Sequence, residues 1–181
     1  VYSIKFWGGL ARLPHMTDAA FALTACHEVG HILGGKPYIN ISSLAHMTSE
    51  GQSDFFASAL CLKKYDQIFK LPIETEVDPY LTSRCYEKFN ESAELETCLK
   101  VGVAGISLAR ALAFLSNYSE LDVAAPSKEE VSETLFNSYP SVQCRLDTFI
   151  SGALSRFDES NPLESPDAHL RPKCWFVKST D

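Results

Sequence analysis

The residues best suited to chemistry are His27-Glu28-Val29-Gly30-His31, an H-E-x-x-H motif. Side chains four positions apart lie on one face of a helix, so both imidazoles can reach one metal ion. Zinc is the natural metal for two imidazoles and a carboxylate. Glu28 can face a zinc-bound water molecule and take its proton as general base. The motif therefore predicts a hydrolytic zinc site; the alternative is two histidines that only make hydrogen bonds on a half-buried helix face.

A catalytic zinc usually keeps three protein ligands and one water, so a third ligand must lie elsewhere in the chain. Glu50 follows His31 after eighteen intervening residues, and Asp54 lies four positions beyond Glu50. This arrangement resembles the gluzincins, the thermolysin-like and aminopeptidase-like zinc peptidases. The resemblance implies that Glu50 is the third zinc ligand and that Asp54 braces a zinc-bound histidine. Alternatively, Glu50 is a solvated glutamate that stabilises a helix N-terminus.

The competing zincin pattern, H-E-x-x-H-x-x-G-x-x-H, fails at its third ligand. Gly34 is in place, but Pro37 occupies the position of the last histidine, and proline cannot bind zinc. His46, which is expected in a loop beside the site, is a substitute third ligand to weigh against Glu50.

A second element, Tyr139–Leu146 with the sequence YPSVQCRL, lies near the C-terminus. It resembles the H-P-x-x-x-x-R-[IL] element of the family that includes the CAAX prenyl endoprotease and bacterial HtpX-like enzymes. There the histidine is thought to stabilise the oxyanion and the arginine to organise the active site. The resemblance assigns these roles to Tyr139 and Arg145, since a tyrosine hydroxyl can also donate to an oxyanion. Alternatively, Pro140 only starts a helix and Arg145 pairs with a surface acid.

The N-terminal segment contains the best strand candidate, the extended run 2–7 followed by Gly8-Gly9-Leu10-Ala11. The latter four residues lie where gluzincins carry an edge strand that holds extended substrate, and the resemblance assigns them that role. Such binding adds a strand to an exposed edge. Alternatively, the segment is an ordinary first strand.

The remaining chain predicts helices. Thr17 is an expected N-cap and Gly34 an expected helix end, whereas Ser49 with Gln52 and Ser127 with Glu130 are possible capping boxes. The expected helices are 18–33, 50–64, 79–90, 92–115, 127–138 and 142–154. We therefore expect a mainly α fold with a small N-terminal β element (α+β) around a gluzincin-like core. One domain spans 1–181, and its Pro-rich tail 157–181 packs back onto the body through Trp175-Phe176.

Charge and hydropathy limit the partners. The net charge is −7, and no Lys/Arg run is longer than Lys63-Lys64, which argues against nucleic acid. The most apolar stretch, 99–115, is interrupted by Lys100 and Arg110 and is at the short edge of a membrane span. We expect it to be a buried core helix, and we expect no transmembrane segment.

The chain has six cysteines and no C-x-x-C pair. An even count in an acidic chain that does not begin with methionine fits an exported, oxidised protein, whereas six free thiols would fit a cytosolic one. Proximity of the expected helices guides one of fifteen possible pairings. The guess is Cys26–Cys61, Cys85–Cys98 and Cys144–Cys174.

These features together predict a metalloendopeptidase with one zinc per chain and a peptide or protein substrate. An aminopeptidase is less favoured, because no additional acidic motif that could bind a free amino terminus is evident. Two alternatives stay open: a catalytically inactive zincin-like domain that binds or stabilises, and a zinc amidase acting on cell-wall peptides.

Overall fold

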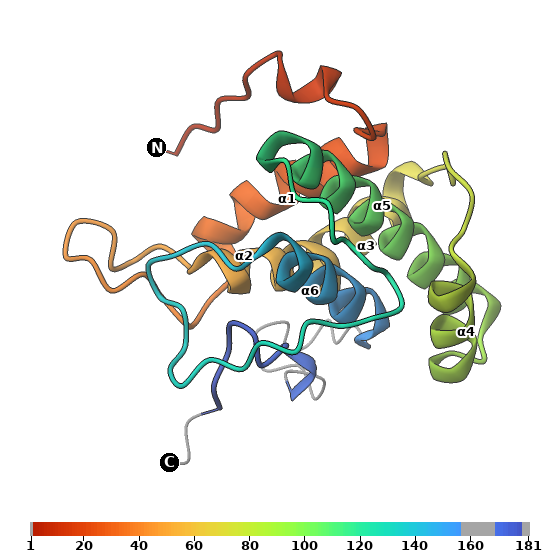
Figure 1. Cartoon of the computed structure of the whole chain (residues 1–181). Coiled ribbons are helices and arrows are strands. Elements are labelled where there is room, and N and C mark those ends of the chain that lie inside the picture. The colour runs from red at the N-terminus through yellow and green to blue at the C-terminus, as the bar shows by residue number, and fades with distance from the viewer. Residues whose placement is uncertain (1, 157–168, 179–181) are drawn as a thin grey trace.

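The structure, a computed structural model, describes residues 2–156 and 169–178, and these form a mainly helical body (Figure 1). The helices are α1 (Asp18–Leu33), α2 (Glu50–Phe56), the π-helical segment Ala57–Cys61, α3 (Leu62–Phe69), α4 (Pro79–Lys88), α5 (Ser92–Ser116) and α6 (Val142–Leu154). Helix α5 packs against α6 and α1, and α2 lies between α1 and α6. The helical part of the predicted fold is therefore present.

Helix α1 has the bounds that its capping residues predict. The Thr17 side chain accepts a hydrogen bond from the Ala20 amide, and the Glu74 carboxylate accepts from the amides of Asp18 and Ala19. Four amides at a helix N-terminus lack partners within the helix, and acidic groups there also complement the helix dipole. Gly34 ends the helix. The H-E-x-x-H motif consequently lies in the second half of a well-capped helix.

The predicted helix 50–64 is longer than expected and is not uniform. It continues to Phe69, and the segment Ala57–Cys61 within it is π-helical. Such segments occur often near functional sites because they shift side chains around the helix axis. The expected capping box at Ser49 is wrong, because the Gln52 side chain donates instead to the Gly34 carbonyl.

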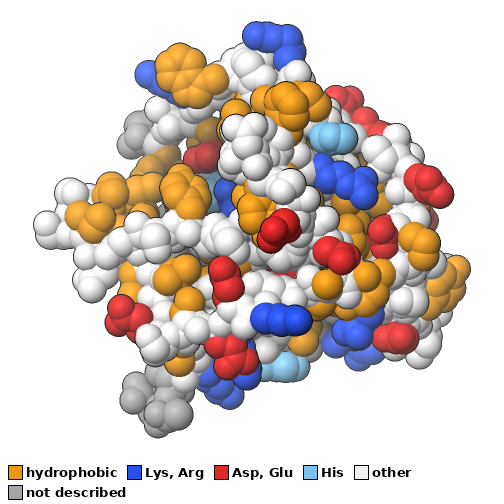
Figure 2. Space-filling model, viewed as in Figure 1, with side chains coloured by type: hydrophobic (Ala, Val, Ile, Leu, Met, Phe, Trp, Pro, Cys, Tyr) orange, Lys and Arg blue, Asp and Glu red, His pale blue; other side chains and the backbone are white. Residues whose placement is uncertain are grey.

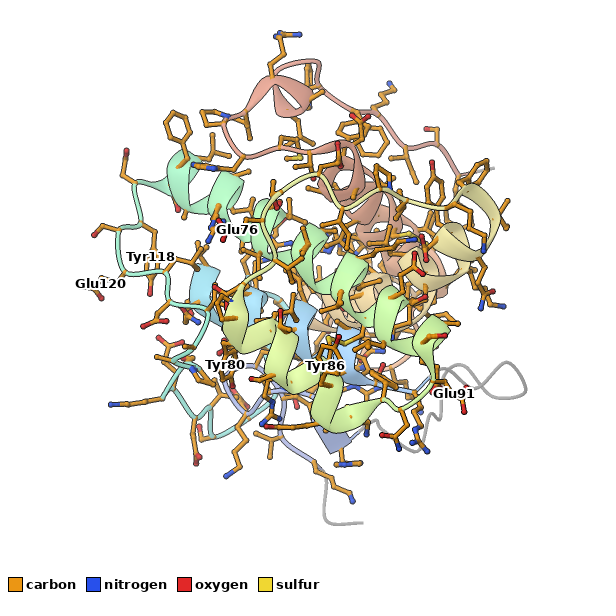
Figure 3. All side chains as sticks on the ribbon, turned by 90° about the vertical axis from the view of Figure 1, so that its right-hand side faces the viewer. Glu76, Tyr80, Tyr86, Glu91, Tyr118 and Glu120 are labelled. Atoms are coloured by element: carbon orange, nitrogen blue, oxygen red, sulfur yellow. A yellow bond between two sulfur atoms is a disulfide. The ribbon has the colours of Figure 1, made fainter. Side chains whose placement is uncertain are left out.

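Helix α5 forms the centre of the core through its small residues. A Cβ atom at Gly102 would lie 2.5 Å from Leu81 Cδ1 on α4, and one at Gly105 would lie 2.6 Å from Phe149 Cβ on α6. These close approaches require glycine. By length and composition α5 could also cross a membrane, but 72% of its most apolar window is buried inside the protein. Figure 3 shows α4, with Tyr80 and Tyr86, lying alongside α5.

The expected N-terminal β element is wrong. Gly8 and Gly9 form a turn, and Leu10–Arg12 form a short 3-10 helix whose amides bond three residues back, as in Leu10 N to Trp7 O at 2.9 Å. A strand needs a neighbouring strand, and the described residues contain no sheet, only an isolated bridge between Tyr38 and Thr48. The backbone therefore satisfies its donors locally, and Gly8-Gly9-Leu10-Ala11 is not an edge strand that could hold a substrate.

The predicted helix 127–138 is also wrong. Two of its amides donate to the C-terminal segment, Val131 N to Lys173 O at 3.0 Å and Leu135 N to Trp175 O at 2.9 Å. These bonds to a distant part of the chain replace the bonds that a helix would make within itself. The Ser127 hydroxyl accepts from the Glu129 amide in a local turn and caps no helix.

All three predicted disulfide pairs are present: Cys26–Cys61, Cys85–Cys98 and Cys144–Cys174. The first joins α1 to the π-helical segment, the second joins α4 to α5, and the third joins α6 to the C-terminal segment. Of the expected tail 157–181, residues 157–168 and 179–181 lie outside the described residues. The part that is described buries Trp175 completely.

Candidate metal centre

The candidate metal centre lies between α1 and α2. His27 and His31 are buried on one face of α1, with ring centroids 4.8 Å apart, and Glu50 begins α2 opposite them. Gly30 permits this approach, since a Cβ atom there would be 3.0 Å from Ser53 Cα on α2. One ligand atom from each of the three residues lies within 4.8 Å of the others, so the group could hold a metal ion.

Hydrogen bonds orient both imidazoles toward Glu50. His31 Nδ1 is 2.8 Å from the Thr48 carbonyl oxygen, which only accepts, so this nitrogen carries the hydrogen. His27 Nδ1 is 2.7 Å from Asp54 Oδ1, which fixes the same tautomer when the ring is neutral. The two Nε2 atoms then present lone pairs at 3.2 and 3.6 Å from the Glu50 carboxylate oxygens. Facing lone pairs repel one another unless a cation lies between them.

Asp54 is itself held by a buried ion pair. Arg145 on α6 donates from Nε and Nη2 to the two oxygens of Asp54, each at 2.8 Å. Two parallel bonds of this kind fix both position and orientation. Arg145, Asp54 and His27 thus form a chain of contacts from α6 through α2 to α1. Histidines that bind metals generally make such a hydrogen bond to a carboxylate through their other ring nitrogen.

The pKa values show that the centre favours positive charge. Burial alone would lower the pKa of His27, but the charge of Asp54 and hydrogen bonds to Asp54 and Glu50 raise it to about 9. Burial alone would raise the pKa of Glu50, but His27, His31 and Arg145 lower it overall. Without a metal, a proton on His27 supplies the positive charge that stabilises the carboxylates of Asp54 and Glu50. A metal ion would replace that proton.

Tyr139 borders the same centre, although it is separated from α2 by more than eighty positions in the sequence. Tyr139 is 67% exposed, and its partial burial, the charge of Glu50 and a hydrogen bond to Glu50 raise the pKa of its hydroxyl, with the charge of Glu28 adding to them. The Arg145 guanidinium lies 5.7 Å from the centre of the Tyr139 ring. A tyrosine with a raised pKa keeps its proton and can donate it in a hydrogen bond.

The structure brings His27, His31, Glu50, Asp54, Tyr139 and Arg145 together at one place. Glu28 lies between the two histidines in sequence, is half-buried, and acts electrostatically on Tyr139. His46 is exposed in the loop 35–48 and is not a member of the group that could hold a metal. Figure 2 shows a recess over α1 in which acidic, basic and histidine side chains lie, with hydrophobic side chains around it.

Two contacts to His31 could not be read from the motif. The Thr48 carbonyl orients the ring, and the Ser53 hydroxyl lies 3.2 Å from Nδ1. A carbonyl leaves no mark in the sequence, because every residue has one. Ser53 lies directly before Asp54 and is buried in α2. This position beside a predicted site residue was the one feature of the sequence that could have indicated its contact with His31.

The donor set suits a metal ion such as zinc. It offers two neutral imidazole nitrogens and a carboxylate, and with the histidines in these tautomers no described group donates to the buried Glu50 Oε2. In the metal-free protein the proton on His27 Nε2, which is 3.2 Å from Glu50 Oε2, supplies this donor, and a bound metal ion would take its place. Comparisons with known protein families, curated proteins and solved structures give no match to this chain. The resemblance to gluzincins therefore depends on the motif residues and their arrangement.

Proposed function

We propose that this protein is a zinc-dependent endopeptidase with His27, His31 and Glu50 as its ligands and one zinc ion per chain. The observation that carries the proposal is the convergence of the Nε2 atoms of His27 and His31 on the Glu50 carboxylate, between α1 and α2. Two histidines, one carboxylate and an open position form the usual ligand set of a hydrolytic zinc site. Glu28 follows the first ligand on α1 and is not part of the group.

The roles of the neighbouring residues follow from their contacts. Zinc bound at this site would polarise a peptide carbonyl and lower the pKa of a water molecule toward about 7. Glu28 accepts the proton of the attacking water and passes it to the leaving amine nitrogen. Tyr139 keeps its hydroxyl proton, in line with its raised pKa, and donates a hydrogen bond to the carbonyl oxygen as negative charge develops there.

Asp54 and Arg145 act through His27. Their buried ion pair holds the His27 ring with Nε2 directed at the metal position. The ring therefore keeps its orientation while substrate binds and leaves. Export is part of the proposal, because three disulfides are typical of proteins in oxidising compartments. The substrate would then be a peptide or protein outside the cytosol.

The test compares the parent with Glu28→Gln after both have been loaded with zinc. We expect equal zinc content, because Glu28 is not a ligand, and a loss of peptide hydrolysis of about 100- to 10,000-fold. Digestion of a broad peptide library, read by mass spectrometry, gives the rate and the cleavage sites. Cleavage at internal bonds supports an endopeptidase.

Other outcomes separate the alternatives. Zinc binding by the parent without any cleavage of the library would favour a non-catalytic zincin-like domain. Cleavage confined to cell-wall peptides, offered as a separate substrate pool, would favour an amidase. Hydrolysis by Glu28→Gln at the parent rate would contradict the assignment of the general base.

A further inference from the structure

The C-terminal strap, defined as residues 170–177, crosses the first turn of α2. Trp175 is completely buried, and a Cβ atom at Gly51 would lie only 2.3 Å from Trp175 Cδ2. The indole ring therefore lies directly on the backbone of the residue that follows Glu50. No larger side chain fits at Gly51 unless the ring or the helix moves.

A second contact from the strap reaches the next residue of α2. Arg171 Nε donates to Gln52 Oε1 at 2.6 Å, and Gln52 Nε2 donates to the Gly34 carbonyl at 2.8 Å. The Arg171 guanidinium also lies 5.2 Å from the ring centre of Phe55 on α2. This chain of bonds ties the strap to the start of α2 and to the end of α1, three positions after His31.

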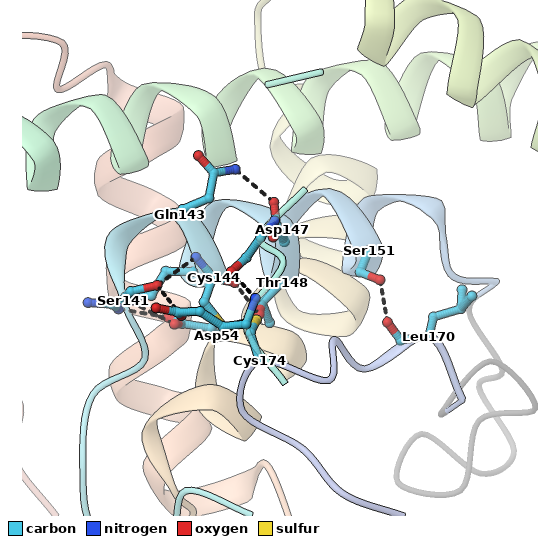
Figure 4. Close-up of a disulfide and its surroundings, with 12 residues drawn as sticks. Asp54, Ser141, Gln143, Cys144, Asp147, Thr148, Ser151, Leu170 and Cys174 are labelled. Atoms are coloured by element: carbon cyan, nitrogen blue, oxygen red, sulfur yellow. Dashed lines mark hydrogen bonds and ion pairs between the residues drawn. A yellow bond between two sulfur atoms is a disulfide. The ribbon is translucent and has the colours of Figure 1, made fainter. Parts of the chain in front are cut away.

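The strap is itself held against the body of the protein. Figure 4 shows the disulfide from Cys174 to Cys144 on α6, close to Asp54, and the bond that Ser151 donates to the Leu170 carbonyl. The helix α6 that anchors the strap also carries the arginine that binds Asp54. Both contacts to α2 thus come from a fixed support.

We propose that the strap positions the metal ligand Glu50, with Trp175 and Arg171 as the positioning residues. They contact Gly51 and Gln52, directly after Glu50, and fix where the first turn of α2 lies relative to the two histidines of α1. The inference rests on the zinc site of the proposed function but not on peptide hydrolysis. Loss of a residue that supports a ligand commonly weakens metal binding by about 10- to 100-fold.

The test measures zinc affinity in full-length Trp175→Leu and Arg171→Met, by competition with a chromophoric chelator. Leu81→Ala is the control, because Leu81 is fully buried between α4 and α5 and does not contact the centre. We expect both strap variants to bind zinc about 10- to 100-fold more weakly. Leu81→Ala should lower the melting temperature of the metal-free protein and change zinc affinity by less than about 3-fold.

Gly51→Ala adds a test that does not remove the strap. Alone, its new methyl group collides with the Trp175 ring and should weaken zinc binding by about 10-fold or more. Combined with Trp175→Leu, which makes room, it should add less than about 3-fold, because residues in contact are not additive.

The outcomes are distinguishable. Strap variants that lower the melting temperature as Leu81→Ala does, yet bind zinc like the parent, would overturn the positioning role. If the zinc affinities of the variants fall as expected but no variant or parent protein hydrolyses peptides, the proposed function would be contradicted and the positioning role of the strap supported. A parent protein that binds no zinc would overturn both.

Discussion

Arg145 on α6 binds both carboxylate oxygens of Asp54 on α2, and Asp54 is fully buried. Burial would raise the pKa of Asp54, but the charges of Arg145 and His27 lower it overall, so the carboxylate stays ionised. Burial would lower the pKa of Arg145, whereas the charge of Asp54 raises it. Each charge is therefore stabilised in the interior mainly by the other, and His27 adds to the stabilisation of Asp54.

Arg145→Met is expected to destabilise the protein by about 3–5 kcal/mol, because it leaves a buried carboxylate without its main partner. Without Arg145 the Asp54 carboxylate is no longer held in position, so the His27 ring that it contacts should be misoriented. Zinc binding should therefore weaken by about 10- to 100-fold. Urea unfolding and chelator competition measure the two effects. The double variant Asp54→Asn/Arg145→Met should lose less stability than the sum of the single variants. Additive losses would contradict the coupling between the two side chains.

Removal of a ligand gives a second prediction. His27→Ala, His31→Ala and Glu50→Ala should each bind zinc far more weakly than the parent, because three protein ligands are needed. His46→Ala should bind zinc like the parent, since His46 is exposed and outside the group. Inductively coupled plasma mass spectrometry of the dialysed proteins gives the zinc content. Zinc retained by Glu50→Ala but lost by His46→Ala would show that the third ligand has been misassigned.

The features that could be predicted from sequence are those decided by neighbouring residues. Thr17 and Gly34 fix the ends of α1 through local bonds, and the four-residue spacing of His27 and His31 places them on one face. Glu50 was placed correctly beside them because its spacing from His31 matches a known arrangement.

The features that could not be predicted depend on distant partners. The segment 127–138 has helix-like capping signals, but Val131 and Leu135 donate to the C-terminal strap instead. The segment 2–11 has the composition of a strand but no neighbouring strand among the described residues. The contact of Trp175 with Gly51 joins residues more than a hundred positions apart, and no periodicity encodes it.

Tyr139→Phe tests the oxyanion role. The substitution keeps the ring near Arg145 and removes only the hydroxyl. If that hydroxyl stabilises the developing charge, kcat should fall by about 100-fold or more while KM barely changes. Steady-state kinetics on one internally cleaved peptide measures both constants. Activity equal to the parent, with only a change in melting temperature, would show that Tyr139 is an aromatic packing residue.

Cys26, which forms a disulfide with Cys61, directly precedes His27 in the sequence. The two cysteines of this disulfide are 35 positions apart, whereas Cys85 and Cys98 are 13 positions apart. In the chain-entropy account, these separations correspond to about 4 and about 3 kcal/mol of stabilisation. Replacing each pair with alanines should therefore cost similar stability in urea unfolding. Only Cys26→Ala/Cys61→Ala should also weaken zinc binding, because Cys26 directly precedes His27 and its disulfide ties this turn of α1 to the π-helical segment that follows α2. Equal zinc affinities in the two double variants would contradict a role for Cys26–Cys61 in holding the metal centre.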